Sequence, residues 1–158
     1  DQAQDMAQRV VMALEGDGRG WGLYGVEFFV KLGPDGDEVI FSELSPRPHD
    51  TGMVTLASQD LSEFDLPARA ILGLPVPATM EARPAASAGI LADRESHEFR
   101  YEGVDTALAV GPTVDVRIFG KPSTRPYRRM GVALSTSGST DSARSLAKRA
   151  ADAVRIVH

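Results

Sequence analysis

Apolar residues recur along the first part of the chain at the spacing of a helix face. Met6, Val10 and Leu14 follow this period, so a helix is predicted over residues 1–14. The glycine-rich stretch 16–20 comes next, but it lacks the Lys-Ser/Thr ending of a phosphate-binding loop. Such a loop also follows a strand rather than a helix, so we interpret this stretch as a connector.

Two strands are predicted next, over residues 21–31 and 38–44, joined by a Gly-Pro-Asp-Gly turn. A symmetric hairpin places Glu27 directly opposite Glu43. Like charges that face each other across a strand pair are unfavourable. Two interpretations fit this spacing: either the carboxylates are solvated or the register slips, or the pair holds a divalent cation such as Mg²⁺.

The same hairpin register pairs Phe29 with Phe41. Together with Trp21 and Phe28, these aromatic residues are predicted to lie in the core, and we do not assign them to an adenine-binding surface.

The rest of the chain contains segments with the apolar spacing of helices and segments with the apolar alternation of strands, which predicts an α+β fold. The expected elements are helices over 61–72 and 139–154 and strands over 85–91, 113–119, 128–134 and 154–157. Ser62 or Asp60 is the expected cap of the first of these helices. The Leu-Pro-Val-Pro sequence from residue 74 indicates a linker, so a boundary between two units is predicted near residue 76.

Residues 41–53, with the sequence FSELSPRPHDTGM, concentrate charged side chains where a strand is predicted to end. Two prolines stiffen the loop and remove backbone donors. A rigid loop of this kind can present Glu43, Arg47, His49 and Asp50 to a ligand. Arg47 is expected to contact a phosphate or carboxylate, or equally to hydrogen-bond within the loop. His49 is expected to hydrogen-bond to the backbone.

A basic cluster follows in the second half of the sequence. Five cationic residues and no carboxylate lie between residues 116 and 140: Arg117, Lys121, Arg125, Arg128 and Arg129. A solvated basic surface is one interpretation, because exposed charges need no function. A phosphate-binding site is the other. Adjacent residues of a strand point to opposite faces, so Arg128 and Arg129 share a face only if a bulge intervenes.

Composition narrows the class of protein. The chain has 158 residues, 42% of them hydrophobic and 25% charged, which is enough for a core in one or two units. The net charge of −5 disfavours general nucleic-acid binding, and the absence of cysteine excludes disulfides and thiolate zinc sites. No apolar run of membrane-spanning length and no leader pattern is visible, so a cytoplasmic protein without a membrane partner is expected. His97 and His158 are assigned no role.

Three motifs together resemble the formate-dependent phosphoribosylglycinamide formyltransferases, which are ATP-grasp enzymes of purine biosynthesis. They are YGVEFF at 24–29, FSELSPRPHDTGMVT at 41–55 with SQDLSEF at 58–64, and FGKP at 119–122 with the Arg128-Arg129 pair. The resemblance implies that residues 1–76 form the C-terminal half of an ATP-grasp domain. It implies that residues 77–158 form a small barrel-like domain, a rudimentary hybrid motif.

The resemblance also implies a reaction and a set of site residues. Such enzymes use ATP to convert formate into formyl phosphate, which the amine of glycinamide ribonucleotide attacks, and they are homodimers. The implied contacts are Glu27 and Glu43 for Mg²⁺ and the ATP phosphates, Asp50 for the ribonucleotide amine, and Lys121, Arg128 and Arg129 for the ribonucleotide 5′-phosphate. Asp50 is the residue predicted to be catalytic.

Two alternatives remain beside this one. The related ATP-grasp carboxylase of aminoimidazole ribonucleotide shares Pro-Arg-Pro-His, but has Asn before the metal-binding Glu and Asn-Ser-Gly-His after the His. Here Ser42 precedes Glu43 and Asp-Thr-Gly-Met follows His49, which favours the formyltransferase. The other alternative is a non-catalytic module that buries its apolar hairpin face against another subunit. Because Asp1 begins the chain within helix-like sequence, we expect part of a longer protein. The enzymes that it resembles have a preceding domain and the first half of the ATP-grasp domain, so the resemblance implies that this chain alone is inactive and binds ATP poorly.

Overall fold

The computed structural model describes residues 2–16, 22–34 and 36–158, and the chain divides into two compact units. The first unit comprises Asp1–Gly52 and Leu61–Ala78, and the second comprises Met53–Asp60 and Thr79–His158. Most of the connector predicted over 16–20, the predicted core residue Trp21 and the central Asp35 of the hairpin turn lie outside the described residues. No helix in the described ranges is both long and apolar enough to cross a membrane.

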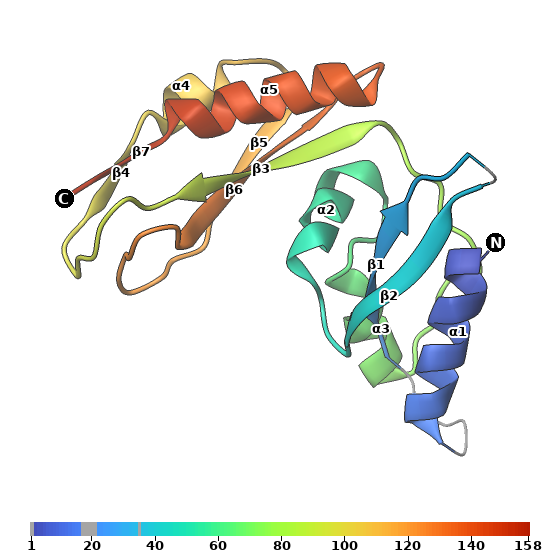
Figure 1. Ribbon diagram of the computed structural model, residues 1–158. Coiled ribbons are helices and arrows are strands. Elements are labelled where there is room, and N and C mark those ends of the chain that lie inside the picture. Colours follow the sequence, from blue (N-terminus) through green and yellow to red (C-terminus); the bar gives the residue numbers. More distant parts are fainter. Residues whose placement is uncertain (1, 17–21, 35) are drawn as a thin grey trace. The chain divides into compact units, whose positions relative to one another are not determined.

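The first unit is a helix beside a β-hairpin, followed by a second helix (Figure 1). Its elements are α1 (Gln2–Glu15), β1 (Gly25–Lys31), β2 (Glu38–Ser45) and α3 (Asp65–Leu72), and the 3₁₀ helix η1 (Asp50–Val54) begins in it. The helix predicted at the start of the chain and the two strands of the predicted hairpin are therefore confirmed.

The hairpin register confirms one predicted pair and corrects the other. Glu27 lies opposite Glu43, as predicted, but Phe28 rather than Phe29 lies opposite Phe41. The register shifts between these pairs, so Ser42 is the extra residue of a β-bulge. The rings of Phe28 and Phe41 meet edge to face, with centroids 6.4 Å apart. A bulge cannot be located from a symmetric alternation pattern, which is why the aromatic pairing was predicted one residue out of register.

The prediction that the hairpin aromatics lie in a core is wrong for two of them. Phe29 is 65% exposed and Phe41 is 39% exposed, while Phe28 is half-buried. Alternate strand residues point to opposite faces, so a two-stranded hairpin exposes any face that no other element covers. The apolar alternation was therefore a sound guide to strands but not to burial.

Helix α3 begins four residues later than predicted, at Asp65, and its N-cap is Phe64, which makes no side-chain cap hydrogen bond, rather than Ser62 or Asp60. Ser62 nevertheless exchanges hydrogen bonds with the first residue of the helix. The Ser62 N–H donates to Asp65 Oδ2 at 2.8 Å, and the Asp65 N–H donates to Ser62 Oγ at 3.3 Å. This reciprocal arrangement satisfies the backbone N–H groups of Ser62 and Asp65. The Ser62 hydroxyl also donates to Asp65 and lowers the pKa of that carboxyl. Gly73, with φ of 65°, ends the helix in the left-handed conformation.

The second unit is an antiparallel sheet, in the order β3-β6-β5, with α5 lying across one face (Figure 1). A two-stranded ribbon of β4 and β7 accompanies it. The elements are α2 (Thr55–Ser58), β3 (Ala85–Leu91), β4 (Arg100–Glu102), α4 (Val104–Leu108), β5 (Val114–Ile118), β6 (Arg129–Thr136), α5 (Thr140–Ala153) and β7 (Arg155–Val157). The long elements match their predictions closely, whereas the short α2, α4 and β4 were not predicted.

Alanines allow α5 to approach the sheet closely. Its buried residues are Ala143, Ala147, Ala150 and Ala151, and they pack against β-strand residues such as Ala86, Ile90 and Ala133. The Ser139 side chain caps the helix by accepting a hydrogen bond from the Ser142 N–H. A well-packed α+β unit results, as predicted.

The predicted barrel, however, is not present in the part of the chain that the structure describes. The second unit has a three-stranded sheet and a separate two-stranded ribbon, and these strands do not close into a barrel. Closure requires each edge strand to pair with another strand. Strands β3 and β5 each pair only with β6, so both remain sheet edges.

Candidate functional site

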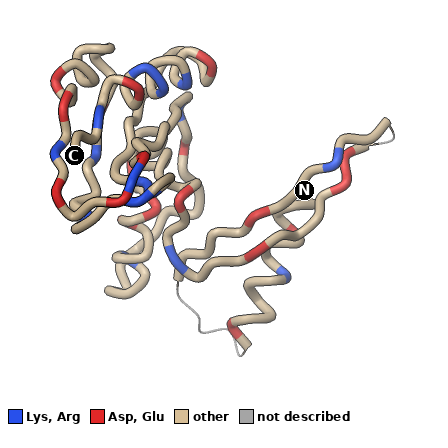
Figure 2. Tube along the Cα trace, turned by 60° about the vertical axis from the view of Figure 1, so that its left-hand side comes forward, with Lys and Arg blue, Asp and Glu red and all other residues tan. Residues whose placement is uncertain are grey.

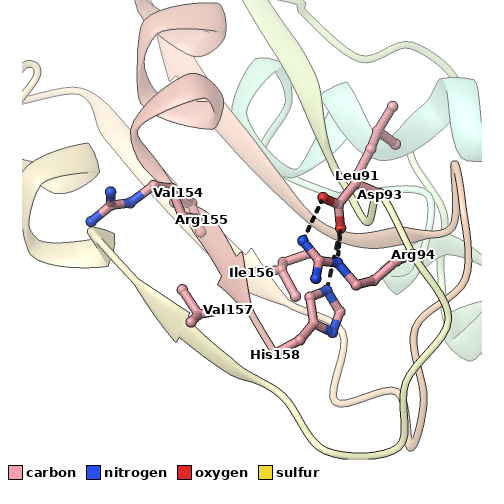
Figure 3. A pocket seen from close by; sticks show the side chains of 8 residues that line it. All are labelled: Leu91, Asp93, Arg94, Val154, Arg155, Ile156, Val157 and His158. Carbon is pink, nitrogen blue, oxygen red and sulfur yellow. Dashed lines mark hydrogen bonds and ion pairs between the residues drawn. The ribbon is translucent and has the colours of Figure 1, made fainter.

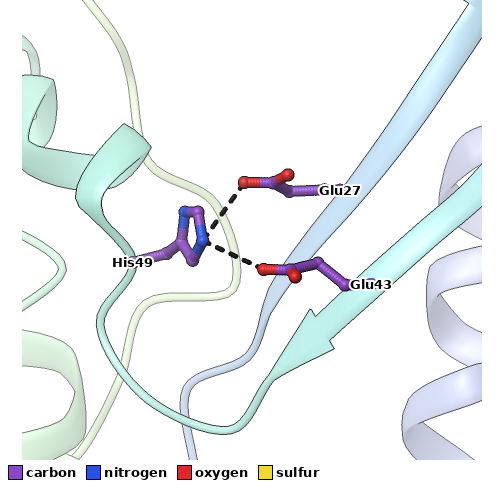
Figure 4. A group of neighbouring side chains, drawn as sticks. All are labelled: Glu27, Glu43 and His49. Carbon is purple, nitrogen blue, oxygen red and sulfur yellow. Dashed lines mark ion pairs between the residues drawn. The ribbon is translucent and has the colours of Figure 1, made fainter.

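Two carboxylates and a histidine meet at the end of the hairpin (Figure 4). His49 Nε2 lies 3.1 Å from Glu27 Oε1 and 3.3 Å from Glu43 Oε1. One ligand-type atom from each of the three residues lies within 4.8 Å of the others. The predicted opposition of the two glutamates is thus present, and the third member of the cluster comes from the Pro-Arg-Pro-His loop.

The acidic side of this cluster faces solvent, while the histidine is held inside. The side chains of Glu27 and Glu43 are 39% and 55% exposed, whereas that of His49 is 17% exposed. Figure 2 shows acidic positions on both strands of the hairpin. A ligand can therefore reach the carboxylates without unfolding the loop.

The loop around His49 is fixed by contacts that the sequence pattern does not reveal. The His49 N–H donates to Glu63 Oε2 at 2.9 Å, and the Gly52 N–H donates to the His49 carbonyl at 2.8 Å. A Cβ added at Gly25 would lie 2.8 Å from the His49 Cβ, so β1 needs glycine to pass the loop. A Cβ at Gly52 would collide with the Glu63 carboxylate.

Glu63 is the buried anchor of this loop. It is 6% exposed, and burial raises the pKa of its carboxyl, while the hydrogen bond from the His49 N–H acts in the opposite direction. A buried carboxylate is costly unless it accepts hydrogen bonds. The loop therefore depends on Glu63 for its position, a role that the sequence analysis did not assign.

The donor set fits a hard divalent cation. Mg²⁺ takes oxygen ligands, and in nucleotide sites it uses one or two carboxylates together with phosphate oxygens. Glu27 and Glu43 offer such oxygens from adjacent strands at one exposed point. The observed pairing excludes a slipped register at these two residues, and the exposed carboxylates fit both the solvated interpretation and the cation interpretation.

The expected hydrogen bonding of His49 to backbone is present, because the Thr51 N–H donates to the ring Nδ1 at 3.4 Å. The ring also contacts the side chains of Thr51, Glu27 and Glu43, which was not expected. Arg47 hydrogen-bonds within the loop, which was one of the two expectations for it: its Nη1 donates to the Pro48 carbonyl at 3.0 Å. Asp50 is exposed and begins η1.

The signal that could have assigned His49 was the opposition of the two glutamates itself. Two facing carboxylates need a nearby donor or cation. His49 is the residue of the same loop that can place a ring N–H at that position.

The predicted phosphate-binding residues lie in the second unit, around the turn before β6. Arg128 Nη1 donates to the Ser123 carbonyl at 3.2 Å and to Ser123 Oγ at 2.9 Å. Lys121 is half-buried, with its Nζ 5.8 Å from the centre of the Phe119 ring. Both cations are therefore oriented by their own loop.

The other two cations of interest differ from these. Arg129 is exposed at the first position of β6, where a bulge interrupts the pairing with β3 and so removes strict alternation. Arg117 pairs with Asp115 at 2.7 Å, so this member of the basic cluster has a carboxylate partner.

A separate hollow of about 480 Å³ lies beside β7 (Figure 3). It is lined by Leu91, Asp93, Arg94, Val154, Arg155, Ile156, Val157 and His158. Asp93 contacts both the Arg94 guanidinium, at 3.4 Å, and His158 Nε2, at 3.3 Å. The hydrogen bond from Arg94 is the main reason that the pKa of Asp93 is lowered. Arg155 pairs with Glu102, outside the lining, at 3.3 Å. Each charged group of the hollow thus has a partner, and we assign the hollow no ligand.

Comparison with known proteins matches both parts of the chain. Residues 1–64 match the family model of the ATP-grasp domain, and residues 85–154 match that of the PurT C-terminal domain. The formate-dependent phosphoribosylglycinamide formyltransferase of Erythrobacter litoralis (strain HTCC2594) is 64% identical over 154 residues, which are 98% of this chain and 38% of that protein.

Solved structures give the same result. The glycinamide-RNase-transformylase T structure from Mycobacterium tuberculosis is 37% identical with a TM-score of 0.73, over 97% of this chain and 37% of that one. N5-carboxyaminoimidazole ribonucleotide synthetase from Thermotoga maritima has a TM-score of 0.79 but is only 28% identical, over 99% of this chain and 43% of that one. The fold is common to both enzymes, and the sequence favours the first.

The chain spans about 38% of the length of the curated relatives it matches. The matches cover its hairpin, its Pro-Arg-Pro-His loop and its second unit. By these matches, residues 1–64 belong to the ATP-grasp domain family and residues 85–154 to the PurT C-terminal family, and the chain as a whole is similar to formate-dependent phosphoribosylglycinamide formyltransferases.

Proposed function

We propose that this chain serves an ATP-dependent formyltransferase that joins formate to the amine of glycinamide ribonucleotide. ATP transfers its γ-phosphoryl group to a formate oxygen, giving formyl phosphate and ADP. The amine then attacks the formyl carbon, the carbon–oxygen bond to phosphate breaks, and the amine loses a proton. The observation that carries this proposal is the exposed Glu27–Glu43 pair beside the Pro-Arg-Pro-His loop.

Glu27 and Glu43 are the residues that would hold Mg²⁺. Bound there, the cation would offset the negative charge that develops during phosphoryl transfer. The two strands fix the carboxylates at one end of the hairpin, so the γ-phosphate of ATP would be directed to the Pro-Arg-Pro-His loop. Asp50 follows His49 in that loop, and we assign it to the ribonucleotide amine, as the catalytic residue.

Lys121, Arg128 and Arg129 are assigned to the ribonucleotide 5′-phosphate. A guanidinium has five N–H donors, so the two bonds from Arg128 to Ser123 orient it and leave donors for a phosphate. A charged handle of this kind supplies binding energy that positions a distant amine.

The two segments of the sequence are assigned to two different domains of the enzyme. We assign residues 1–76 to the C-terminal part of the ATP-grasp domain and residues 77–158 to the terminal domain, which the family matches over 1–64 and 85–154 support. A homodimer, a cytoplasmic location and the inactivity of this chain alone remain predictions.

The test uses the full-length protein and measures ADP release with Mg²⁺, ATP, glycinamide ribonucleotide and formate. We expect turnover that depends on formate. Glu43→Gln should lower it by more than about 100-fold, because even a residue that only supports a metal ligand is worth about 10–100-fold. Arg128→Ala should raise the KM for the ribonucleotide about 10–100-fold, the value of hydrogen bonds to a charged group.

Two controls accompany this assay. Arg144→Ala removes an exposed arginine that pairs with Asp141 on α5, and it should leave both parameters unchanged. Bicarbonate with aminoimidazole ribonucleotide replaces the two substrates in a parallel assay. Turnover with that pair alone would assign the protein to the carboxylases instead, and no turnover with either pair would contradict an enzymatic role.

A further inference from the structure

We propose that His49 is a positioning residue of the metal centre, and that its ring N–H holds the two metal-binding carboxylates in place. This inference rests on the proposed function, because it takes Glu27 and Glu43 as the ligands. A single ring nitrogen, Nε2, makes both contacts, at 3.1 Å to Glu27 Oε1 and 3.3 Å to Glu43 Oε1 (Figure 4).

The contacts on the other ring nitrogen determine which nitrogen carries the proton. The Thr51 N–H points at His49 Nδ1 at 3.4 Å, and a backbone N–H can only donate. The Thr51 hydroxyl lies 3.0 Å from the same nitrogen and can rotate to donate as well. Nδ1 is then the acceptor, and the ring N–H lies at Nε2, between the carboxylates. A nitrogen in that state donates hydrogen bonds and does not bind a metal.

The ring is rigid enough to set the geometry of its partners. Its side chain is only 17% exposed, its backbone N–H is bound by buried Glu63 at 2.9 Å, and its Cβ packs against the glycine backbone of β1 at Gly25. The glutamates, in contrast, are 39% and 55% exposed and have flexible side chains. The position of the histidine ring therefore determines the positions of the two glutamate carboxylates.

This arrangement solves the electrostatic problem of the hairpin. Two carboxylates that face each other across a strand pair repel, and without a donor their side chains would separate. The Nε2–H donates to one oxygen of each glutamate. The second oxygen of each carboxylate is then available to a cation. Outer partners of this kind are typically worth about 10–100-fold in metal affinity.

The experiment measures Mn²⁺ binding to the full-length protein by electron paramagnetic resonance, with a fixed concentration of a non-hydrolysable ATP analogue. We expect His49→Ala to weaken Mn²⁺ binding about 10–100-fold. His49→Gln, whose amide can donate near the position of Nε2, should recover part of that loss. The matched control is His97→Ala, an exposed histidine of the second unit, which should bind Mn²⁺ as the wild type does.

Four outcomes would overturn the inference. Unchanged Mn²⁺ affinity in His49→Ala, with wild-type binding intact, would reject it and leave the proposed function standing. A ¹⁴N coupling to Mn²⁺ that disappears in His49→Ala would show that His49 is a ligand instead. Equal losses in the Ala and Gln variants, together with a lowered thermal unfolding midpoint in both, would reduce His49 to a structural role. Failure of the wild type to bind Mn²⁺ at all would reject the metal site and the proposed function with it.

Discussion

The two units of the chain differ in what they bury. In the described ranges, every buried apolar side chain belongs to the second unit, including Met130 and Leu134 of β6 and four alanines of α5. The buried side chains of the first unit are polar: Ser45, Ser62 and Glu63. Its large apolar residues are at the surface, with Phe29 at 65% and Ile71 at 81% exposure.

The difference shows two ways to fix a functional loop. The second unit holds its arginines on the end of a strand whose interior is packed against a helix, so apolar burial supplies the rigidity. The first unit holds His49 with hydrogen bonds to a buried carboxylate and with close backbone contacts at glycine. Its geometry should therefore respond to charge and to pH, whereas that of the second unit should respond to side-chain volume.

The largest effect should come from a cavity in the second unit. Leu134 is 1% exposed in the centre of β6, and Leu134→Ala should lower the free energy of unfolding by about 2–5 kcal/mol. Hydrogen exchange read by mass spectrometry should show faster exchange in peptides of β3, β5, β6 and α5. Peptides of the hairpin should keep their wild-type exchange rates.

Ile71→Ala provides the matched control for that variant. It removes a side chain of the same size from α3, but one that is 81% exposed, so a change within about 0.5 kcal/mol is expected. If Leu134→Ala accelerated exchange in the hairpin as strongly as in β6, the two units would not differ in the way described above.

A smaller effect is expected from the polar anchor of the first unit. Glu63→Ala removes the acceptor of the His49 N–H and should cost about 1–3 kcal/mol, because a buried donor is left without a partner. Glu63→Gln keeps a carbonyl oxygen there and removes the buried charge. Urea unfolding of both variants, followed at several pH values between about 4 and 8, measures the difference.

The sign of the pH dependence follows from burial. Burial raises the pKa of the Glu63 carboxyl in the folded state above its value in the unfolded state. The free energy of unfolding of the wild type is therefore highest below the unfolded-state pKa, and it decreases as the pH rises through the folded-state pKa. Glutamine does not titrate. The stability of Glu63→Gln relative to wild type should therefore increase with pH over that range, and a constant difference would refute the role given to burial.

Sequence periodicity was enough to predict the long elements of both units. The spacing of apolar residues located α1, β3 and α5 because these elements have one buried or partly buried face that repeats over several turns or residues. The three-residue strand β4 and the five-residue helix α4 are too short to show a period. The expected barrel came from resemblance, and pairing between distant strands has no local signal.

The candidate site was predictable to the extent that it is local. Glu27 and Glu43 are joined by one hairpin, so a turn signal was sufficient to place them opposite each other. Glu63 lies fourteen residues beyond His49, and no periodicity connects the two residues. The contact depends on how the loop folds back onto the turn before α3, and the shift of the aromatic pair depends on a bulge at Ser42.

The smallest expected effect is a gain in stability next to the phosphate-binding residues. Tyr127 has φ of 61° and is 85% exposed in the turn closed by the Arg128 N–H and the Arg125 carbonyl, at 2.9 Å. A positive φ is unfavourable for residues with a Cβ, and glycine adopts it without strain. Tyr127→Gly should therefore raise the free energy of unfolding by about 0.5–1 kcal/mol, measured by urea unfolding.

Tyr127→Ala is the informative control, because it removes the same ring but keeps the Cβ and so the backbone strain. It should leave stability near that of the wild type, since an exposed ring contributes little packing. If the alanine variant gained as much as the glycine variant, the ring rather than the backbone would be the unfavourable feature. A loss of stability in both would mean that the exposed ring makes contacts that support the turn, and that a strained backbone at this turn is offset by them.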